Sequence, residues 1–89
     1  MAAESLRIDK LLFFLRLAKS RSLALHWVEG GHVRVNGKRV EKGSAPVHVG
    51  DVITMPKQDD VMILQLTAIP HRRGPASEAQ ACYIDKRSQ

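Results

Sequence analysis

The sequence predicts an α+β domain in which two N-terminal helices pack on a small, mostly antiparallel sheet, with a short helix near the C-terminus. Two periodicities indicate this class. Up to residue 29 the apolar residues recur at the three- and four-residue spacing of a helix, and from residue 33 they alternate with polar residues, as in a strand. Between two alternating stretches lies Asn36-Gly37, the strongest short-range signal for a β-hairpin.

The first helix is expected to start at Ser5, which is a suitable N-cap, and to end near Leu17 or Ala18. Its buried stripe has helical spacing and consists of Ile8, Leu11, Leu12 and Leu15. Lys19 would fall on the same stripe if the helix continued, so the helix must stop before it. Phe13 points away from the stripe and needs a second cover.

The second helix is predicted over residues 21–29, with Ser20 as its N-cap and Gly30-Gly31 as its end. Glycine favours such ends because it adopts the left-handed conformation without a Cβ clash. The short connection between the two helices predicts a compact helical corner. The expected buried face of this helix is Leu23, Ala24, Trp27 and Val28.

Alternating stretches and turn residues define the rest of the chain. The predicted strands are Val33–Val35, a strand that begins at Lys38, Val47–Val49, a strand from Val52 to Met55, and Val61–Ile69. Gly50-Asp51 and residues 56–60 are expected to be turns, residues 76–83 a short helix, and residues 85–89 a frayed polar tail. We therefore expect one domain over residues 5–69 and an extension over residues 70–89.

Composition excludes several classes of protein. A chain of 89 residues holds one domain, which excludes an enzyme with separate cofactor and substrate domains. The apolar content of 44% is that of a folded chain, and one cysteine cannot form a disulfide within it. No apolar run approaches the roughly 20 residues of a membrane span, and the N-terminus does not resemble a secretory signal. These features favour a cytoplasmic protein without membrane contact.

The net charge is confined to the first half of the chain. Residues 1–42 hold nine lysines and arginines against four carboxylates, which gives +5, and residues 43–89 hold five of each, which gives zero. This asymmetry favours a half that binds a polyanion on a neutral scaffold. The alternative is a basic surface that is merely solvated.

Four separated motifs occur in order along residues 7–54. They are Arg7-x-Asp9-x-x-Leu12, Ser20-Arg21-x-x-Ala24, Gly31-x-Val33-x-Val35-Asn36-Gly37 and Gly50-Asp51-x-Ile53. In content and spacing they resemble the S4 RNA-binding domain. The resemblance implies an S4-type αL motif, a helical pair packed on a small sheet, that binds structured RNA along its helical edge and hairpin.

The resemblance and the chemistry of the side chains together indicate the candidate RNA-binding residues. Arginine presents a planar fork that can bridge two phosphate oxygens, and a helix N-terminus such as that at Ser20 suits an anion. Arg21 lies in that first turn, where its charge opposes the helix dipole, which suggests a role outside stability. The candidates are Arg7, Lys10, Phe13, Lys19, Ser20, Arg21, Lys38, Arg39, Arg72 and Arg73.

Some of these residues have a structural alternative. Arg21 could pair with Asp9 or Glu29, and Asp9 is expected to orient a neighbouring arginine or to cap a backbone amide. Phe13 could be covered by the C-terminal segment, by a partner or by a nucleobase. Asn36 and Gly37 are interpreted first as turn formers, and Trp27 first as a core residue.

A second resemblance involves residues 72–79, Arg-Arg-Gly-Pro-Ala-Ser-Glu-Ala, with Tyr83 after them. They look like the segment that follows the domain in the ribosome-associated heat-shock group of this family, whose members have a longer basic C-terminal extension. That group binds large ribosomal subunits that are blocked by peptidyl-tRNA. The resemblance implies ribosomal RNA of the large subunit as the partner, with tRNA as a further candidate, and Arg72 and Arg73 as either RNA contacts or a solvated pair.

Nothing in the sequence indicates catalysis. The four histidines have no metal-ligand spacing, one cysteine cannot complete a cysteine-rich zinc site, and neither a phosphate-binding glycine loop nor a catalytic triad order is present. We therefore expect a non-enzymatic protein with no cofactor and no metal. Two alternatives stay open: an RNA-binding accessory or fragment of an RNA-modifying enzyme such as a pseudouridine synthase, and a module whose basic face binds an acidic protein.

Overall fold

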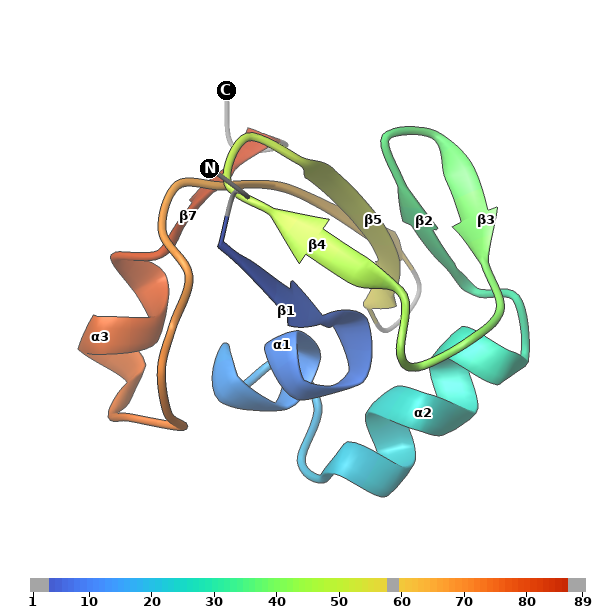
Figure 1. The fold of residues 1–89 in the computed structure, drawn as a ribbon, viewed down its shortest axis with the longest axis horizontal. Coiled ribbons are helices and arrows are strands. Elements are labelled where there is room, and N and C mark those ends of the chain that lie inside the picture. Colours follow the sequence, from blue (N-terminus) through green and yellow to red (C-terminus); the bar gives the residue numbers. More distant parts are fainter. Residues whose placement is uncertain (1–3, 58–59, 87–89) are drawn as a thin grey trace.

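The computed structural model describes residues 4–57 and 60–86. Its elements in chain order are β1 (Ser5–Arg7), α1 (Ile8–Phe14), α2 (Arg21–Glu29), β2 (Val33–Val35), β3 (Lys38–Val40), β4 (Pro46–His48), β5 (Val52–Lys57), β6 (Asp60–Leu66), α3 (Ala76–Gln80) and β7 (Tyr83–Asp85). β3, β2, β5, β6 and β7 form one five-stranded sheet in that order, and β1 pairs with β4 in a second, two-stranded sheet. Every strand pair in these two sheets is antiparallel, so the predicted α+β class is confirmed (Figure 1).

The predicted hairpin at Asn36-Gly37 is confirmed. Both turn residues have positive φ, 54° and 83°, as a two-residue hairpin turn requires. The Asn36 side chain also bridges to the next strand, because its amide nitrogen donates to Asp51 Oδ1 and its oxygen accepts from Val52 N. Both polar atoms of the Asn36 side chain are therefore used in structural hydrogen bonds.

The start of the first helix differs from the prediction. Residues 5–7 form β1, paired with β4, and α1 begins only at Ile8. Ser5 is not its N-cap, because the first amides of the helix already have backbone acceptors: Ile8 N donates to Ala45 O and Asp9 N to Gly43 O. A distant loop therefore replaces the expected local cap.

The end of the first helix also differs, since α1 stops at Phe14 rather than near Leu17 or Ala18. Arg16 adopts a left-handed conformation with φ 62°, after which the amides of Leu17 and Ala18 both donate to Leu12 O. This tight turn returns Ala18 to the core beside Leu15, and both are at most 2% exposed. The turn buries apolar residues at helical spacing without being helical.

The second helix matches its predicted bounds. Ser20 accepts a hydrogen bond from Leu23 N through its hydroxyl, as an N-cap does, and Gly31 follows the helix with φ 79°. Ala24 and Val28 are buried, whereas Leu23 and Trp27 are only half-buried. The predicted buried face is therefore correct for two of its four residues and partial for the others.

Three later strands differ from the prediction. The strand expected over residues 47–49 lies at residues 46–48, and Val49 is 56% exposed. β5 continues through Pro56, which is tolerated because β2 pairs with β5 only at Ile53 and Thr54. The long strand ends at Leu66 rather than Ile69. Of the turn predicted over residues 56–60, residues 56, 57 and 60 belong to strands, and residues 58–59 lie outside the described residues.

Near the C-terminus the chain forms a shorter helix and an additional strand. α3 ends at Gln80 instead of Tyr83, and β7 extends the main sheet beside β6 at the place of the expected helix end and polar tail. Residues 87–89 of that tail lie outside the described residues. The segment after residue 69 is thus joined to the sheet by backbone hydrogen bonds rather than being loosely appended.

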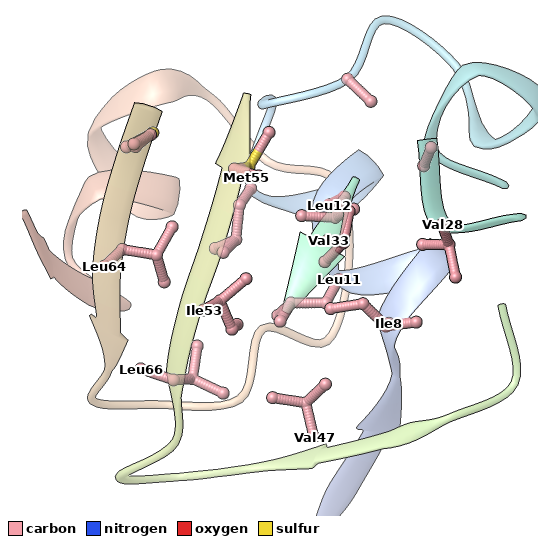
Figure 2. Packing of buried hydrophobic residues seen from close by; sticks show 14 of the residues in the cluster. Ile8, Leu11, Leu12, Val28, Val33, Val47, Ile53, Met55, Leu64 and Leu66 are labelled. Atoms are coloured by element: carbon pink, nitrogen blue, oxygen red, sulfur yellow. The ribbon is translucent and has the colours of Figure 1, made fainter. Parts of the chain in front are cut away.

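One apolar cluster joins the helices to both sheets. Figure 2 shows Ile8, Leu11 and Leu12 of α1 facing side chains of β2, β4, β5 and β6. Val33, Val47, Ile53 and Leu64 in these strands are fully buried. Burial of this kind contributes about 1.5–3 kcal/mol for each large side chain, so this cluster fixes the helical corner against the sheet. Among the described residues no helix is long and apolar enough to cross a membrane.

Candidate nucleic-acid interface

A buried carboxylate organises the basic residues at the helical corner. Asp9 is 3% exposed, and its two carboxylate oxygens accept from the Arg7 guanidinium at 2.8 and 2.9 Å. Asp9 Oδ1 also accepts from the Lys10 amide at 2.7 Å, and Oδ2 lies 3.4 Å from Arg21 Nη2. Asp9 thus both orients arginines and caps an amide, the two roles expected for it.

These contacts determine the charge state of Asp9. Burial raises the pKa of this carboxyl, but the hydrogen bonds from Arg7 and the Lys10 amide and the charges of Arg7 and Arg21 outweigh it, so the pKa is lowered from its ordinary value of 3.8. Asp9 is therefore ionised at neutral pH. Two guanidinium groups share one carboxylate, which leaves a net positive charge in the cluster.

The two arginines remain accessible. Their side chains are 44% and 45% exposed, and they border a shallow depression of about 290 Å³ together with Asp9, Ser22 and Leu25. Gly43 packs closely against two of these residues: a Cβ there would lie 2.5 Å from Leu25 Cδ1 and 3.0 Å from Asp9 Oδ2. Each guanidinium, held on one side by Asp9, can offer its remaining donors to a ligand at this depression.

The N-terminus of α2 adds backbone donors beside Arg21. The Ser20 hydroxyl satisfies Leu23 N, and Ala24 N donates to Ser20 O. The first amides, of Arg21 and Ser22, have no acceptor within the described residues, as is usual for the first turn of a helix. Ser20 therefore acts mainly as the cap, while the amides beside it point outward where an anion would bind.

The β2–β3 hairpin, whose base follows the C-terminal end of α2 (Figure 1), carries a second basic group. Lys38 and Arg39 are exposed, and the Arg39 side chain lies over Gly31, where a Cβ would be 3.2 Å from Arg39 Cδ. Arg34 is exposed as well and is the cross-strand partner of Arg39. Two like charges directly opposite each other destabilise a hairpin, which suggests a functional reason for them.

Arg34 was absent from the candidates although the sequence contained the signal. In a hairpin with a two-residue turn at 36 and 37, residues 35 and 38 pair and so do residues 34 and 39. That register alone places Arg34 opposite Arg39. Counting basic residues across the hairpin, rather than only at its tip, would have identified it.

Three candidates from α1 and the C-terminal segment have partners within the molecule. The Arg73 guanidinium lies 4.7 Å from the centroid of the Phe13 ring and donates to Phe13 O at 3.2 Å. Arg72 pairs with Glu78 at 2.8 Å. In return, Arg16 of the turn after α1 donates to Gly74 O at 3.0 Å. The C-terminal segment is therefore the second cover that Phe13 needed.

The remaining candidates lie near these groups without joining the Asp9 cluster through their side chains. Lys10 follows Asp9 on α1 and is half-buried, and Lys19 is exposed in the turn before α2. The structure thus brings Arg7 and Arg21 together, places Lys38 and Arg39 at the opposite end of α2, and separates Arg72 from both groups.

The part of the chain that the structure describes contains no cluster of three or more residues suited to bind a metal ion. Burial, together with the charge of Glu78, raises the pKa of the Cys82 thiol, and burial, together with Asp85, raises that of Tyr83. Neither group has the lowered pKa of an activated nucleophile.

The fold agrees with the comparisons to known proteins. The chain belongs to the S4 domain family, whose model matches residues 6–53. It is similar to heat shock protein 15 of Escherichia coli K12, with 38% identity over 81 residues that cover 91% of this chain and 60% of that protein. The chain therefore spans less than two thirds of that relative's length.

Two further relatives support the assignment. A trimeric structure of heat shock protein 15 from Vibrio cholerae matches with a TM-score of 0.88 and 39% identity, covering 96% of this chain and 85% of that one. The small ribosomal subunit protein uS4 of Opitutus terrae is 47% identical over 47 residues, which cover 53% of this chain and 23% of that protein. The fold match therefore extends beyond the S4 segment to the C-terminal elements.

Proposed function

We propose that this protein binds structured RNA without catalysis, through phosphate contacts at the two ends of α2. The observation that carries the proposal is the pair of half-exposed arginines held by one buried carboxylate, Asp9, beside the open amides of α2. Arginine forks that are already oriented lose little side-chain entropy when they bind phosphate. Membership in the S4 family supports the same ligand class.

The binding surface we assign has two parts. The corner part consists of Arg7, Lys10, Lys19, Ser20 and Arg21, and the hairpin part consists of Arg34, Lys38 and Arg39. A nine-residue helix separates them, which corresponds to about 13 Å. Phosphates of a folded RNA can span such a distance, so recognition would follow the shape of the backbone rather than a base sequence.

Phe13, Arg72 and Arg73 have a different place in this proposal. Their stacking and ion-pair contacts lie within the molecule, so we assign them to holding the C-terminal segment against α1. Direct RNA contacts of these three residues would add to the surface only at its margin. This assignment makes the corner and the hairpin the main determinants of affinity.

The proposed RNA is ribosomal RNA of the large subunit, in the cytoplasm, with rescue of subunits blocked by peptidyl-tRNA as the proposed setting. Similarity to heat shock protein 15 and the resemblance of residues 72–79 to the ribosome-associated group support it. Similarity to a ribosomal protein over the S4 segment supports ribosomal RNA as the class of ligand. tRNA would be a further contact in that setting.

The proposal is tested by binding measurements in vitro and by crosslinking in cells. Binding of the purified protein to isolated ribosomal subunits should weaken steeply with salt, because phosphate contacts release counterions. Arg21→Ala should weaken binding while thermal unfolding stays close to that of the parent. Crosslinking in cells followed by sequencing should concentrate reads in large-subunit ribosomal RNA. Unchanged binding by both Arg21→Ala and Lys38→Ala would refute the site, and reads spread over unrelated RNAs would refute the ribosomal assignment.

A further inference from the structure

An apolar groove lies beside the corner part of the binding surface and shares only Lys19 with it. It measures about 420 Å³ and is bordered by the turn after α1, the outer side of α2 and the far ends of β5 and β6. This volume is within the range of sites that hold small organic groups. No ligand role has so far been assigned to any residue on its floor.

The floor and walls of the groove are unusually adaptable and include an aromatic face. Met55 and Met62 are cross-strand partners and form its buried floor. Leu23 and Trp27, one turn apart on α2, form a wall and are only half-buried. Thioethers adjust to planar groups, and an indole offers a face for stacking.

The rim of the groove is positively charged. Arg16 and Lys19 are exposed on it, and among the described residues its lining includes no acidic residue. Arg16 is held there by its left-handed backbone and by its bond to Gly74 O, and Lys19 directly precedes the cap of α2. An apolar interior with a cationic rim complements a planar aromatic group that is linked to phosphates.

We infer that this groove takes one unpaired nucleobase of the bound RNA. The base would stack on Trp27 over the methionine floor while its flanking phosphates lie against Lys19 and Arg16. The inference rests on the proposed function and deepens it, because Lys19 belongs both to the groove rim and to the corner surface. A strand whose phosphate lies at the N-terminus of α2 has an adjacent nucleotide at the groove.

Trp27 has a donor free for such a ligand. Within residues 4–57 and 60–86 no acceptor is bonded to its indole N–H, and no buried polar side-chain atom is left without a partner, so this N–H faces solvent. A stacked or edge-on base could accept from it. Because the chain has a single tryptophan, its fluorescence reports on this groove alone.

The experiment compares two RNA hairpins that differ in one group. One carries a single bulged adenosine and the other an abasic nucleotide at the same position, so their duplexes and phosphates are matched. We expect the intact protein to bind the adenosine hairpin roughly five- to tenfold more tightly, since stacking of one base contributes that much. Only this hairpin should strongly quench the fluorescence of Trp27.

Three variants separate the groove from the phosphate surface. Trp27→Leu should lower affinity for the adenosine hairpin to that for the abasic one, and Phe14→Leu, which changes a half-buried aromatic outside the groove, should keep the difference. Arg21→Ala should weaken both hairpins equally. Circular dichroism and thermal unfolding check that each variant is folded.

The outcomes distinguish the two proposals. Equal affinity for both hairpins, with tryptophan fluorescence alike in the two complexes, would overturn the nucleobase assignment while leaving phosphate binding intact, and an apolar peptide would then be the occupant to consider. If neither hairpin binds at low salt, the proposed function and the groove assignment are overturned together.

Discussion

The arginines of the helical corner and those of the C-terminal segment carry the same charge but are held in different ways. At the corner Arg7 and Arg21 share one carboxylate, that of Asp9, and both remain nearly half-exposed. In the C-terminal segment Arg72 has its own carboxylate, Glu78, and Arg73 lies on the Phe13 ring. The corner therefore keeps an uncompensated positive charge, because two guanidinium groups share one carboxylate, whereas the charge of Arg72, although its side chain is 69% exposed, is balanced by Glu78.

The largest expected effect comes from reversing the charge of an arginine at the helical corner, with the same change in the C-terminal segment as its control. Arg21→Glu should lower affinity for ribosomal RNA on the order of 100-fold, because it places a carboxylate beside Asp9 and repels phosphate. Arg72→Glu makes the same change of charge in the C-terminal segment and should lower affinity only a few fold. Filter binding at fixed salt measures both. Similar losses in the two variants would mean that net charge alone governs binding.

A second prediction concerns Asp9 as the residue that orients the corner. Asp9→Asn raises the formal net charge from +5 to +6, yet we expect weaker RNA binding, because Arg7 and Arg21 lose the group that holds them. The free energy of unfolding should fall by about 2 kcal/mol, the contribution of hydrogen bonds to a charged group. Urea unfolding and RNA titrations provide the two measurements.

Glu41→Gln is the matched control for Asp9. It makes the same change of charge at an exposed residue that has no ion pair in the described structure. Its RNA affinity should rise slightly and its stability should stay the same. If Asp9→Asn also bound RNA more tightly, orientation of the arginines would be irrelevant to binding.

The third prediction is the pH dependence of stability. The pKa of Asp9 is lower in the folded protein than its ordinary value of 3.8, so the unfolded chain binds the proton more readily. The stabilisation is complete above that ordinary value and is lost as the pH falls through the lowered pKa. The difference in unfolding free energy between the parent and Asp9→Asn should therefore be constant near neutral pH and shrink below about pH 4. A difference that is independent of pH would exclude the Asp9 charge as its source.

The smallest expected effect is in the C-terminal segment, at Arg73. Arg73→Ala removes a cation–π contact and one hydrogen bond, and should lower the unfolding free energy by about 0.5–1 kcal/mol. Its RNA affinity should stay within about twofold of the parent. A thermal melt and an RNA titration test this, and a loss of affinity as large as that of Arg21→Ala would move the binding surface to the C-terminal segment.

Local signals predicted the fold where local interactions decide it. α2 matches its predicted bounds because its cap and its terminating glycines lie next to it in sequence, and the hairpin matches because Asn36 and Gly37 alone determine the turn. The first helix was predicted with wrong ends because its caps are tertiary. Its N-terminal amides bond to the loop at Gly43 and Ala45, and its end is set by a left-handed arginine, which no propensity would place there.

The candidate site was predictable to a similar extent. The charge asymmetry and the motifs led to the prediction of the corner residues, of which the structure brings Arg7 and Arg21 together on Asp9, and a structural role was predicted for Asp9 and for Asn36. The sequence could not show that Arg73 lies on Phe13, because that contact joins residues 60 positions apart. The groove was also hidden, since it combines α2 with two strands and Trp27 was interpreted as a core residue.

The hydrophobic core extends beyond the segment that matches the S4 family. The S4 match ends at residue 53, but the buried cluster continues through Met62, Leu64 and Leu66 to Ile69. A fragment cut at the end of the match would lose most of β5 together with β6 and β7, and with them the buried residues Met55, Met62, Leu64 and Leu66. The stretch that matches the family and the stretch that builds the core are therefore different lengths of chain, and we expect that transplanting the proposed RNA-binding surface into another protein requires the longer one.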